Sequence, residues 1–246
     1  MKRLFAVLLA TLLPLSLSLA QGVTVPSVNI GVGGGAKGDE VSTSLQILAL
    51  LTILSIAPSL LILTTAFTRI VIVFSFLRTA MGTQSIPPNP VMIGLSLFLT
   101  FYVMGPTFEK INDTALKPYM AKEISIEVAT KNAEAPIREF MLKNTYKKDL
   151  EMFLSYRNET AVDKETVPLL SLIPAFVISE LKTAFVIGFY LFLPFIVIDL
   201  IVASILMSMG MMMMPPVVIS LPAKILVFVL ADGWSVVVKA ILSGYM

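Results

Sequence analysis

The fold is indicated most clearly by TAFVIGFYLFLPFIVIDLIVASILMSMGMMMMPPVVISLPA, residues 183–223, in which Asp199 is the only charged residue. About 20 consecutive apolar residues are enough for a helix to cross a bilayer, and this stretch is roughly twice that length. Gly210 and the pair Pro215-Pro216 interrupt it. These breaks predict a hairpin whose first helix ends near residue 209 and whose second helix begins near residue 217.

The chain as a whole is too apolar for a soluble protein. Of its 246 residues, 57% are hydrophobic and only 14% are charged, and its mean hydropathy is +0.89. Soluble domains usually contain about 25% charged residues. A soluble core of this size could not hide so much apolar surface, so lipid or partner subunits must cover it.

Composition also excludes several kinds of function. The net charge of +2 is too small to indicate a nucleic-acid partner. The chain has no cysteine and no histidine, which excludes disulfides, thiolate metal sites, thiol nucleophiles and Ser–His dyads. No group of Asp and Glu residues has the spacing of a metal site. We therefore expect no catalysis, no metal and no cofactor.

Residues 1–20 are typical of a cleavable signal peptide. A positive start at Lys2-Arg3 precedes a short apolar core, and Ser18-Leu19-Ala20 places small residues where a signal peptidase cuts, which predicts cleavage after Ala20. The alternative is a first transmembrane anchor. Residues 21–44 are predicted to be a flexible periplasmic linker. Their formal match to the G-x-G-x-x-G nucleotide motif lacks the preceding strand that a dinucleotide site needs.

Residues 45–106 are predicted to form a first membrane helical hairpin. The run from Leu45 to Phe67 carries no charge, Arg69 and Arg78 follow it, and a second apolar run covers Val91 to Met104. A first helix that enters the cell and two arginines in the inner loop agree with the positive-inside rule. The second helix then returns the chain to the periplasm.

Residues 107–166 are predicted to be a charged, helical periplasmic segment. Residues 107–165 hold 21 of the 34 charges of the chain. Residues 136–156 have helical periodicity, with two interpretations open: one helix with two apolar faces, or a helix bent or broken near residues 143–148. The two faces consist of Ile137, Phe140 and Met141, and of Leu142, Tyr146, Leu150 and Phe153.

Residues 167–246 are predicted to form a second membrane helical hairpin that contains the methionine-rich loop. The expected fold class is therefore all-α: an integral membrane helical protein with long helical hairpins and a small helical periplasmic segment. We expect it to cross the membrane several times and to contact membrane lipid.

Charged residues inside the second hairpin cannot face lipid, because a carboxylate at the bilayer centre costs about 2.5–3.5 kcal/mol on insertion scales. Residues 180 and 182 are two positions apart, so they cannot pair along one helix face. Two interpretations are open. The charges have a function, as a proton or ion path or as inter-subunit salt bridges, or they pair structurally inside the helix bundle. The residues concerned are Glu180, Lys182, Asp199 and Asp232.

Six of the 14 methionines of the chain lie between Met207 and Met214. Methionine is flexible and polarizable and conforms to irregular partners. On a turn, a ring of thioethers around a pore would block ions and still deform around a passing chain. The alternative is that these side chains fill gaps in a core.

Several long motifs stand in a specific order along the chain. They are TRIVIVFSFLR at Thr68–Arg78, GTQ at Gly82–Gln84, PPN at Pro87–Asn89, LFLTF at Leu97–Phe101, PAF at Pro174–Phe176, SELKTAF at Ser179–Phe185, IDL at Ile198–Leu200, the run Met207–Pro216, and LADGW at Leu230–Trp234. Over roughly residues 45–110 and 136–240, these motifs strongly resemble the FliP family of flagellar and type III secretion export-gate proteins.

The resemblance implies a non-enzymatic, pore-forming subunit of the flagellar type III protein export gate. It implies a helical assembly of about five copies with FliQ and FliR, with FlhA and FlhB as associated membrane components. Unfolded flagellar subunits would pass through its centre across the bacterial inner membrane, at the flagellar basal body. Much of the apolar helix surface would then pack on other subunits, and Glu180 and Lys182 become candidates for inter-subunit pairs.

The resemblance also implies a role for the methionines, because in the family the methionine-rich loop lines the constriction as a gasket. The matching residues here are Met211, Met212 and Met213, with Met209 and Met214 as further candidates.

Two other functions have less support in the sequence. An ion-coupled secondary transporter using Asp199 and Glu180 would show internal repeats, and none is evident between residues 45–110 and 170–240. An intramembrane protease would need a histidine, or an aspartyl-protease context that Asp199 and Asp232 lack.

Overall fold

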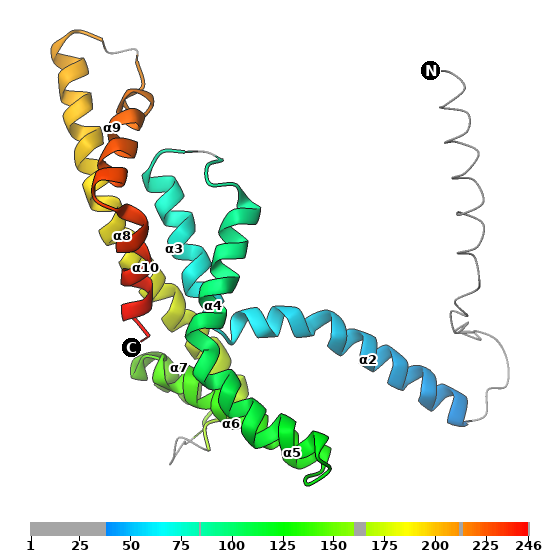
Figure 1. Ribbon diagram of the computed structural model, residues 1–246. Coiled ribbons are helices and arrows are strands. Elements are labelled where there is room, and N and C mark those ends of the chain that lie inside the picture. The colour runs from blue at the N-terminus through cyan, green and yellow to red at the C-terminus, as the bar shows by residue number, and fades with distance from the viewer. Residues whose placement is uncertain (1–37, 84, 160–165, 212–213, 246) are drawn as a thin grey trace, which may run out of the picture. The chain divides into compact units, whose positions relative to one another are not determined.

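The computed structural model describes residues 38–83, 85–159, 166–211 and 214–245 (Figure 1). Every regular element in these ranges is helical, which confirms the all-α prediction. The signal peptide, its cleavage site at Ala20 and most of the linker lie outside the described residues. The elements are α2 (Gly38–Leu63), α3 (Phe67–Ala80), α4 (Asn89–Ile111), a π-helical turn (Asn112–Leu116), α5 (Lys117–Met120), α6 (Ile126–Lys143), α7 (Lys147–Tyr156), α8 (Leu169–Ser208), α9 (Pro216–Leu230) and α10 (Gly233–Ser243).

The chain divides into two units at residues 55 and 56, a boundary that falls within α2. Helix α2 begins at Gly38, ahead of the apolar run that was predicted to start at Leu45. Its apolar side chains are largely exposed: Leu48 is 62% exposed and Leu54 is 66% exposed. The other helices of the described ranges all lie within residues 56–246.

Helix α3 supplies the centre of the core in the second unit. Ile70, Val73, Phe74 and Leu77 follow the i, i+3, i+4, i+7 spacing of one helix face, and all four are buried. This face packs against α8, where Ala184 is also buried. Each large apolar side chain that is fully buried in this way contributes about 1.5–3 kcal/mol.

Helices α3 and α8 pack tightly at Gly188 of α8. A Cβ atom at this position would lie 2.6 Å from the ring of Phe76. A glycine inside a helix costs about 0.5–1 kcal/mol relative to alanine. The close approach of the two helices is therefore the structural reason for this glycine.

The first hairpin is arranged differently from the expectation. Helices α3 and α4, joined by residues 81–88, form the hairpin, and α2 ends before it at Leu63. Arg69 lies inside α3 and is 2% exposed, so the prediction that it occupies an inner loop is wrong. The reason is that Glu180 of α8 neutralises its charge, which allows the guanidinium to lie between apolar helices.

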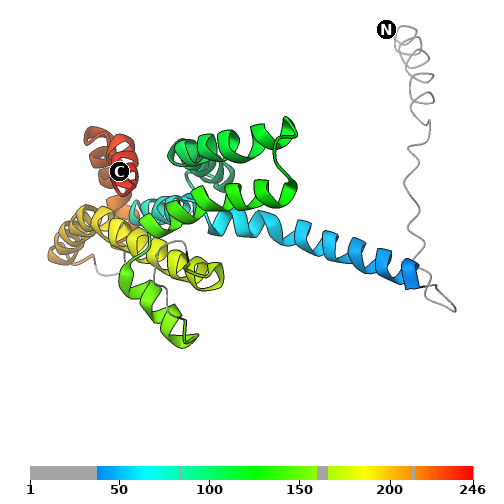
Figure 2. The same cartoon turned by 90° about the horizontal axis from the view of Figure 1, so that it is seen from below.

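Residues 136–156 of the charged segment lie in two separate helices. Helix α6 ends at Lys143 and α7 begins at Lys147, so the interpretation as a broken helix is correct and the single helix with two apolar faces is wrong. Both α6 and α7 pack against α8 (Figure 2). Met141 of α6 joins Leu172 and Phe176 of α8 in a second buried cluster.

Helix α8 is 40 residues long and is followed by α9. It ends at Ser208 and α9 begins at Pro216, each one residue from the position that the glycine and proline breaks predict. Helix α9 bends by 67° into α10.

Two described helical stretches are long and apolar enough to cross a membrane, Asn89–Met120 and Leu169–Ser208. Two bent pairs raise the number to four if each pair forms one span. Many large apolar side chains on these helices are exposed, such as Phe98 at 76%. A fold with this much exposed apolar surface needs lipid or other subunits around it.

Candidate functional site

The methionine-rich turn joins α8 to α9, at the opposite end of α8 from α7 (Figure 1). Met212 and Met213 lie outside the described residues. The described methionines around them are exposed: Met207 58%, Met209 61%, Met211 37% and Met214 40%. Their exposure argues against the alternative in which these four side chains fill a core.

The backbone at the end of α8 explains why the turn begins where it does. Gly210 has φ +77, in the left-handed region that glycine adopts without steric cost. The N–H of Gly210 donates to the carbonyl of Met207, and the N–H of Met211 donates to the carbonyl of Leu206. These two bonds form a Schellman cap. Pro216 then starts α9 at a position where its missing N–H costs nothing.

A junction of polar groups ties three helices together below the turn. Asp199 of α8 accepts hydrogen bonds from Ser220 Oγ (2.5 Å) and from Lys224 Nζ (2.6 Å), both on α9. Lys224 is 2% exposed. Its Nζ also donates to the carbonyl of Ala80 at the end of α3, at 3.2 Å. The charge of Lys224 is thus paired and hydrogen-bonded, as a buried charge must be.

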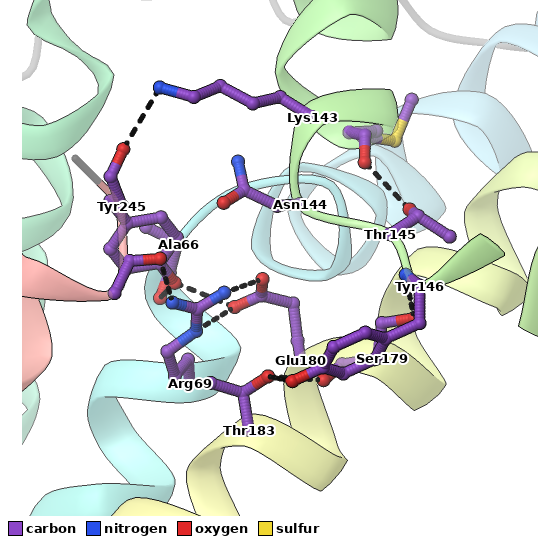
Figure 3. A network of polar contacts seen from close by, with 12 residues as sticks. Ala66, Arg69, Lys143, Asn144, Thr145, Tyr146, Ser179, Glu180, Thr183 and Tyr245 are labelled. Carbon is purple, nitrogen blue, oxygen red and sulfur yellow. Dashed lines mark hydrogen bonds and ion pairs between the residues drawn. The ribbon is translucent and has the colours of Figure 1, made fainter.

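A second junction joins α3, α8 and the C-terminal residues (Figure 3). The Arg69 guanidinium donates to both carboxylate oxygens of Glu180, at 2.8 and 2.5 Å, in the bidentate geometry that gives strong ion pairs. The Tyr245 hydroxyl donates to Glu180 at 2.6 Å, and Arg69 also donates to the carbonyl of Gly244 at 2.8 Å. The guanidinium carbon lies 3.8 Å from the centre of the Tyr245 ring, which adds a cation–π contact.

A third junction attaches α7 to α8. Lys182 forms an ion pair with Asp149, and Ser179 Oγ donates to Asp149 at 2.9 Å. The N–H of Tyr146 donates to Ser179 at 3.0 Å; Figure 3 shows this contact beside the Glu180 network. Burial raises the pKa of Asp149, but the hydrogen bonds from Lys182 and Ser179 outweigh it and hold this pKa below its ordinary value.

The four charges singled out in the sequence therefore have different environments. Glu180, Lys182 and Asp199 each have a partner of opposite charge within the chain. Asp232 lies exposed at the bend between α9 and α10, with φ +49. Within residues 214–245, the described part around it, no ion pair to Asp232 is formed.

Sequence reasoning missed three partners, Arg69, Asp149 and Lys224. Arg69 carried a signal, because it interrupts an otherwise apolar run and needs a counter-charge there. Asp149 carried none, since it stands among many charged neighbours that look solvated. In the described ranges, no three His, Cys, Asp or Glu side chains gather in a way that could hold a metal.

The comparison with known families decides the class of protein. The model of the FliP family matches residues 50–241, a range that includes the methionine-rich turn and the ion pairs of the three junctions. The chain belongs to the FliP family. Its relatives include three proteins that are each named flagellar biosynthetic protein FliP.

The relative from Bacillus subtilis is 54% identical over 217 residues, covering 88% of this chain and 98% of that protein. The relative from Aquifex aeolicus is 50% identical over 224 residues, covering 90% of this chain and 92% of that protein. The relative from Caulobacter vibrioides is 49% identical over 228 residues, covering 92% and 85% respectively. As a FliP-family member, the chain is a membrane-embedded flagellar biosynthetic protein and a component of the flagellar export apparatus, working with other export-gate proteins.

Proposed function

We propose that the chain is a core pore-forming subunit of the flagellar type III protein export gate, and that its methionine-rich turn seals the channel. The observation that carries the proposal is the exposure of Met207, Met209, Met211 and Met214 where α8 turns into α9. A monomer has no reason to present so many thioethers to solvent at one turn. In a ring of subunits this exposure has a reason, because the methionines of each turn contact those of the neighbouring turns.

Methionine suits a seal that must open for an unfolded chain. Its side chain has three rotatable bonds and a polarizable sulfur, so it adapts to irregular surfaces. The Schellman cap at Gly210 and the start of α9 at Pro216 fix both ends of the turn. Met211, Met212 and Met213 between them form the proposed gasket, with Met209 and Met214 as possible additional contacts.

The exposed surface of α8 supports assembly with other subunits. Phe185, Phe189 and Tyr190 are each more than half exposed, on a helix that packs on α3. In the proposed gate these surfaces pack on about five copies of the chain and on FliQ and FliR, with FlhA and FlhB nearby and lipid outside. The gate lies in the inner membrane at the flagellar basal body, with residues 107–166 in the periplasm.

The transporter alternative receives no support from the site. Its two coupling carboxylates, Glu180 and Asp199, are already neutralised by Arg69 and Lys224 of the same chain. A coupling site must bind and release an ion during each cycle, and these pairs are held by several hydrogen bonds each.

The proposal is tested by replacing Met211, Met212 and Met213 together with alanine. The expected result is a leak of ions and small solutes through a complex that still assembles, measured as membrane permeability alongside native mass spectrometry of the detergent-extracted complex. The matched control is Met120→Ala, which removes an exposed methionine of α5. Unchanged permeability in a correctly assembled triple variant would overturn the proposal.

A further inference from the structure

The turn between α3 and α4 touches the beginning of α9. Gly82, just after α3, is so close to α9 that a Cβ atom on it would lie 3.4 Å from Val217 Cγ1 and 3.7 Å from Lys224 Nζ. Val217 is the second residue of α9 and stands three positions after Met214. The α3–α4 turn therefore meets α9 directly beneath the methionine-rich turn.

The described part of the α3–α4 turn is held by its own hydrogen bonds. The N–H of Gly82 donates to the carbonyl of Thr79, which caps α3. Thr83 Oγ1 donates to the carbonyl of Ile86 at 2.5 Å, and Arg78 donates to Asn89 Oδ1 at 2.5 Å, which joins the two helices across the turn. A segment tied in this way moves with the core of α3 rather than independently.

Lys224 fixes the other side of the contact. It bonds Asp199 of α8 and the carbonyl of Ala80 of α3 at the same time. Helix α9 is thus held in two places, at Lys224 by an ion pair to α8 and at its start, Val217, by contact with the α3–α4 turn. At the other end of the methionine-rich turn, a Cβ atom on Gly210 would meet no atom within 4 Å.

We propose that the α3–α4 turn braces the methionine-rich turn, and that Gly82 is a positioning residue for the seal. The inference rests on the proposed function of that turn. A Cβ atom alone at position 82 makes ordinary contact with Val217, but a side chain that extends beyond Cβ pushes on Val217 and displaces the start of α9. The methionines that follow α8 then no longer meet those of neighbouring subunits, and the closed gate leaks although the ion pairs remain.

Two substitutions separate contact from backbone strain, because Gly82 has φ +75. Asparagine tolerates this left-handed conformation better than alanine does but extends further toward Val217. If the contact matters, Gly82→Asn leaks several-fold more than Gly82→Ala. If only strain matters, the order is reversed. Val217→Ala makes room for the larger side chain, so the double variant Gly82→Asn/Val217→Ala restores the seal only if contact is the cause.

The position of α9 relative to α3 is measured independently of leakage. The chain has no cysteine, so spin labels can be attached to cysteines introduced at Ser75 of α3 and Val218 of α9, both exposed. In the assembled complex, Gly82→Asn is expected to shift the distance between the labels, and Val217→Ala is expected to restore it. Gly94→Ala, in α4 with nothing within 4 Å of its new Cβ atom, is the control and is expected to change neither measurement.

The outcomes distinguish this inference from the proposed function. An unchanged label distance in Gly82→Asn overturns the brace. A shifted distance without leakage, while the Met211–Met213 variant does leak, overturns the link between brace and seal. A shifted distance with no leak in either variant overturns the proposed seal and leaves only the mechanical contact. If Gly82→Asn does not assemble, Val217→Ala alone must broaden the label distances, and an unbroadened distribution overturns the brace.

Discussion

Arg69 of α3 and Glu180 of α8, 111 positions apart in the chain, form a bidentate ion pair in which both side chains are buried. Tyr245 and the carbonyl of Gly244 complete the hydrogen bonding of the pair. The pair therefore connects the first helix of the core, the longest helix and the last residues of the chain. Its desolvation is compensated only while both partners are present.

Removing one partner of this pair is expected to cost far more than removing both. Glu180→Leu leaves the Arg69 guanidinium buried without a counter-charge, which costs about 3–5 kcal/mol. The double variant Arg69→Met/Glu180→Leu removes both charges and is expected to lie closer to the wild type. Thermal unfolding of the extracted protein, followed by circular dichroism, measures the difference. A double variant as unstable as the single one would show that the loss of stability comes from lost packing and not from the unpaired charge.

Acid is expected to loosen α7 from α8 through Asp149. The pKa of Asp149 in the folded protein lies below its ordinary value because of Lys182 and Ser179. A carboxyl group whose pKa is lowered in the folded protein stabilises the fold at pH values above its ordinary pKa of about 3.9. This stabilisation is lost as the pH falls through the lowered pKa. The effect is modest, since Lys182 is 54% exposed and solvent screens the pair.

The loosening is measured with a spin label attached at Tyr156→Cys, an exposed position in α7. The mobility of the label is compared at pH 7 and at acidic pH. Asp149→Asn is expected to remove the acid response of the label. Glu151→Gln, which changes an exposed acid of the same helix, is expected to keep it. Retention of the full response in Asp149→Asn would assign the pH dependence to another group.

Local signals in the sequence located the helix ends around the methionine-rich turn. Gly210 and Pro215-Pro216 act through backbone conformation alone, so they predict the turn without knowledge of the fold. The need of Glu180 for a partner was equally visible, because an isolated charge in an apolar run is costly.

The identity of the partners was not visible in the sequence. Arg69 meets Glu180, and Asp149 meets Lys182, only because α3 and α7 pack on α8. The break between α6 and α7 had a similar cause, since the N–H of Tyr146 at the break is satisfied by Ser179 of α8. Periodicity reports which side of a helix is apolar, but it does not report which other helix covers it.

Alanine at Gly188 is expected to destabilise the contact between α3 and α8. The new Cβ atom would lie 2.6 Å from the Phe76 ring, so a side chain or a helix must shift, at a cost of about 1–3 kcal/mol. Phe76→Leu, which shortens the opposing side chain, is expected to recover part of that loss. Gly105→Ala in α4 meets no atom within 4 Å and is expected to be neutral or stabilising, because alanine favours helix. Equal unfolding temperatures for Gly188→Ala and Gly105→Ala would contradict the close packing.

Alanine at Gly210 is expected to weaken the end of α8 without any steric clash. No atom lies within 4 Å of the new Cβ position, so the whole effect comes from φ +77. A residue with a Cβ atom pays about 1–2 kcal/mol in this conformation, and asparagine pays less. Under that strain the cap formed by the N–H groups of Gly210 and Met211 opens, and the last turn of α8 frays. Faster hydrogen exchange at Met209 and Met211 measures the fraying, with the order Gly210→Ala above Gly210→Asn above wild type. The same exchange rates in all three proteins would mean that the turn is held by contacts between subunits and not by its own cap.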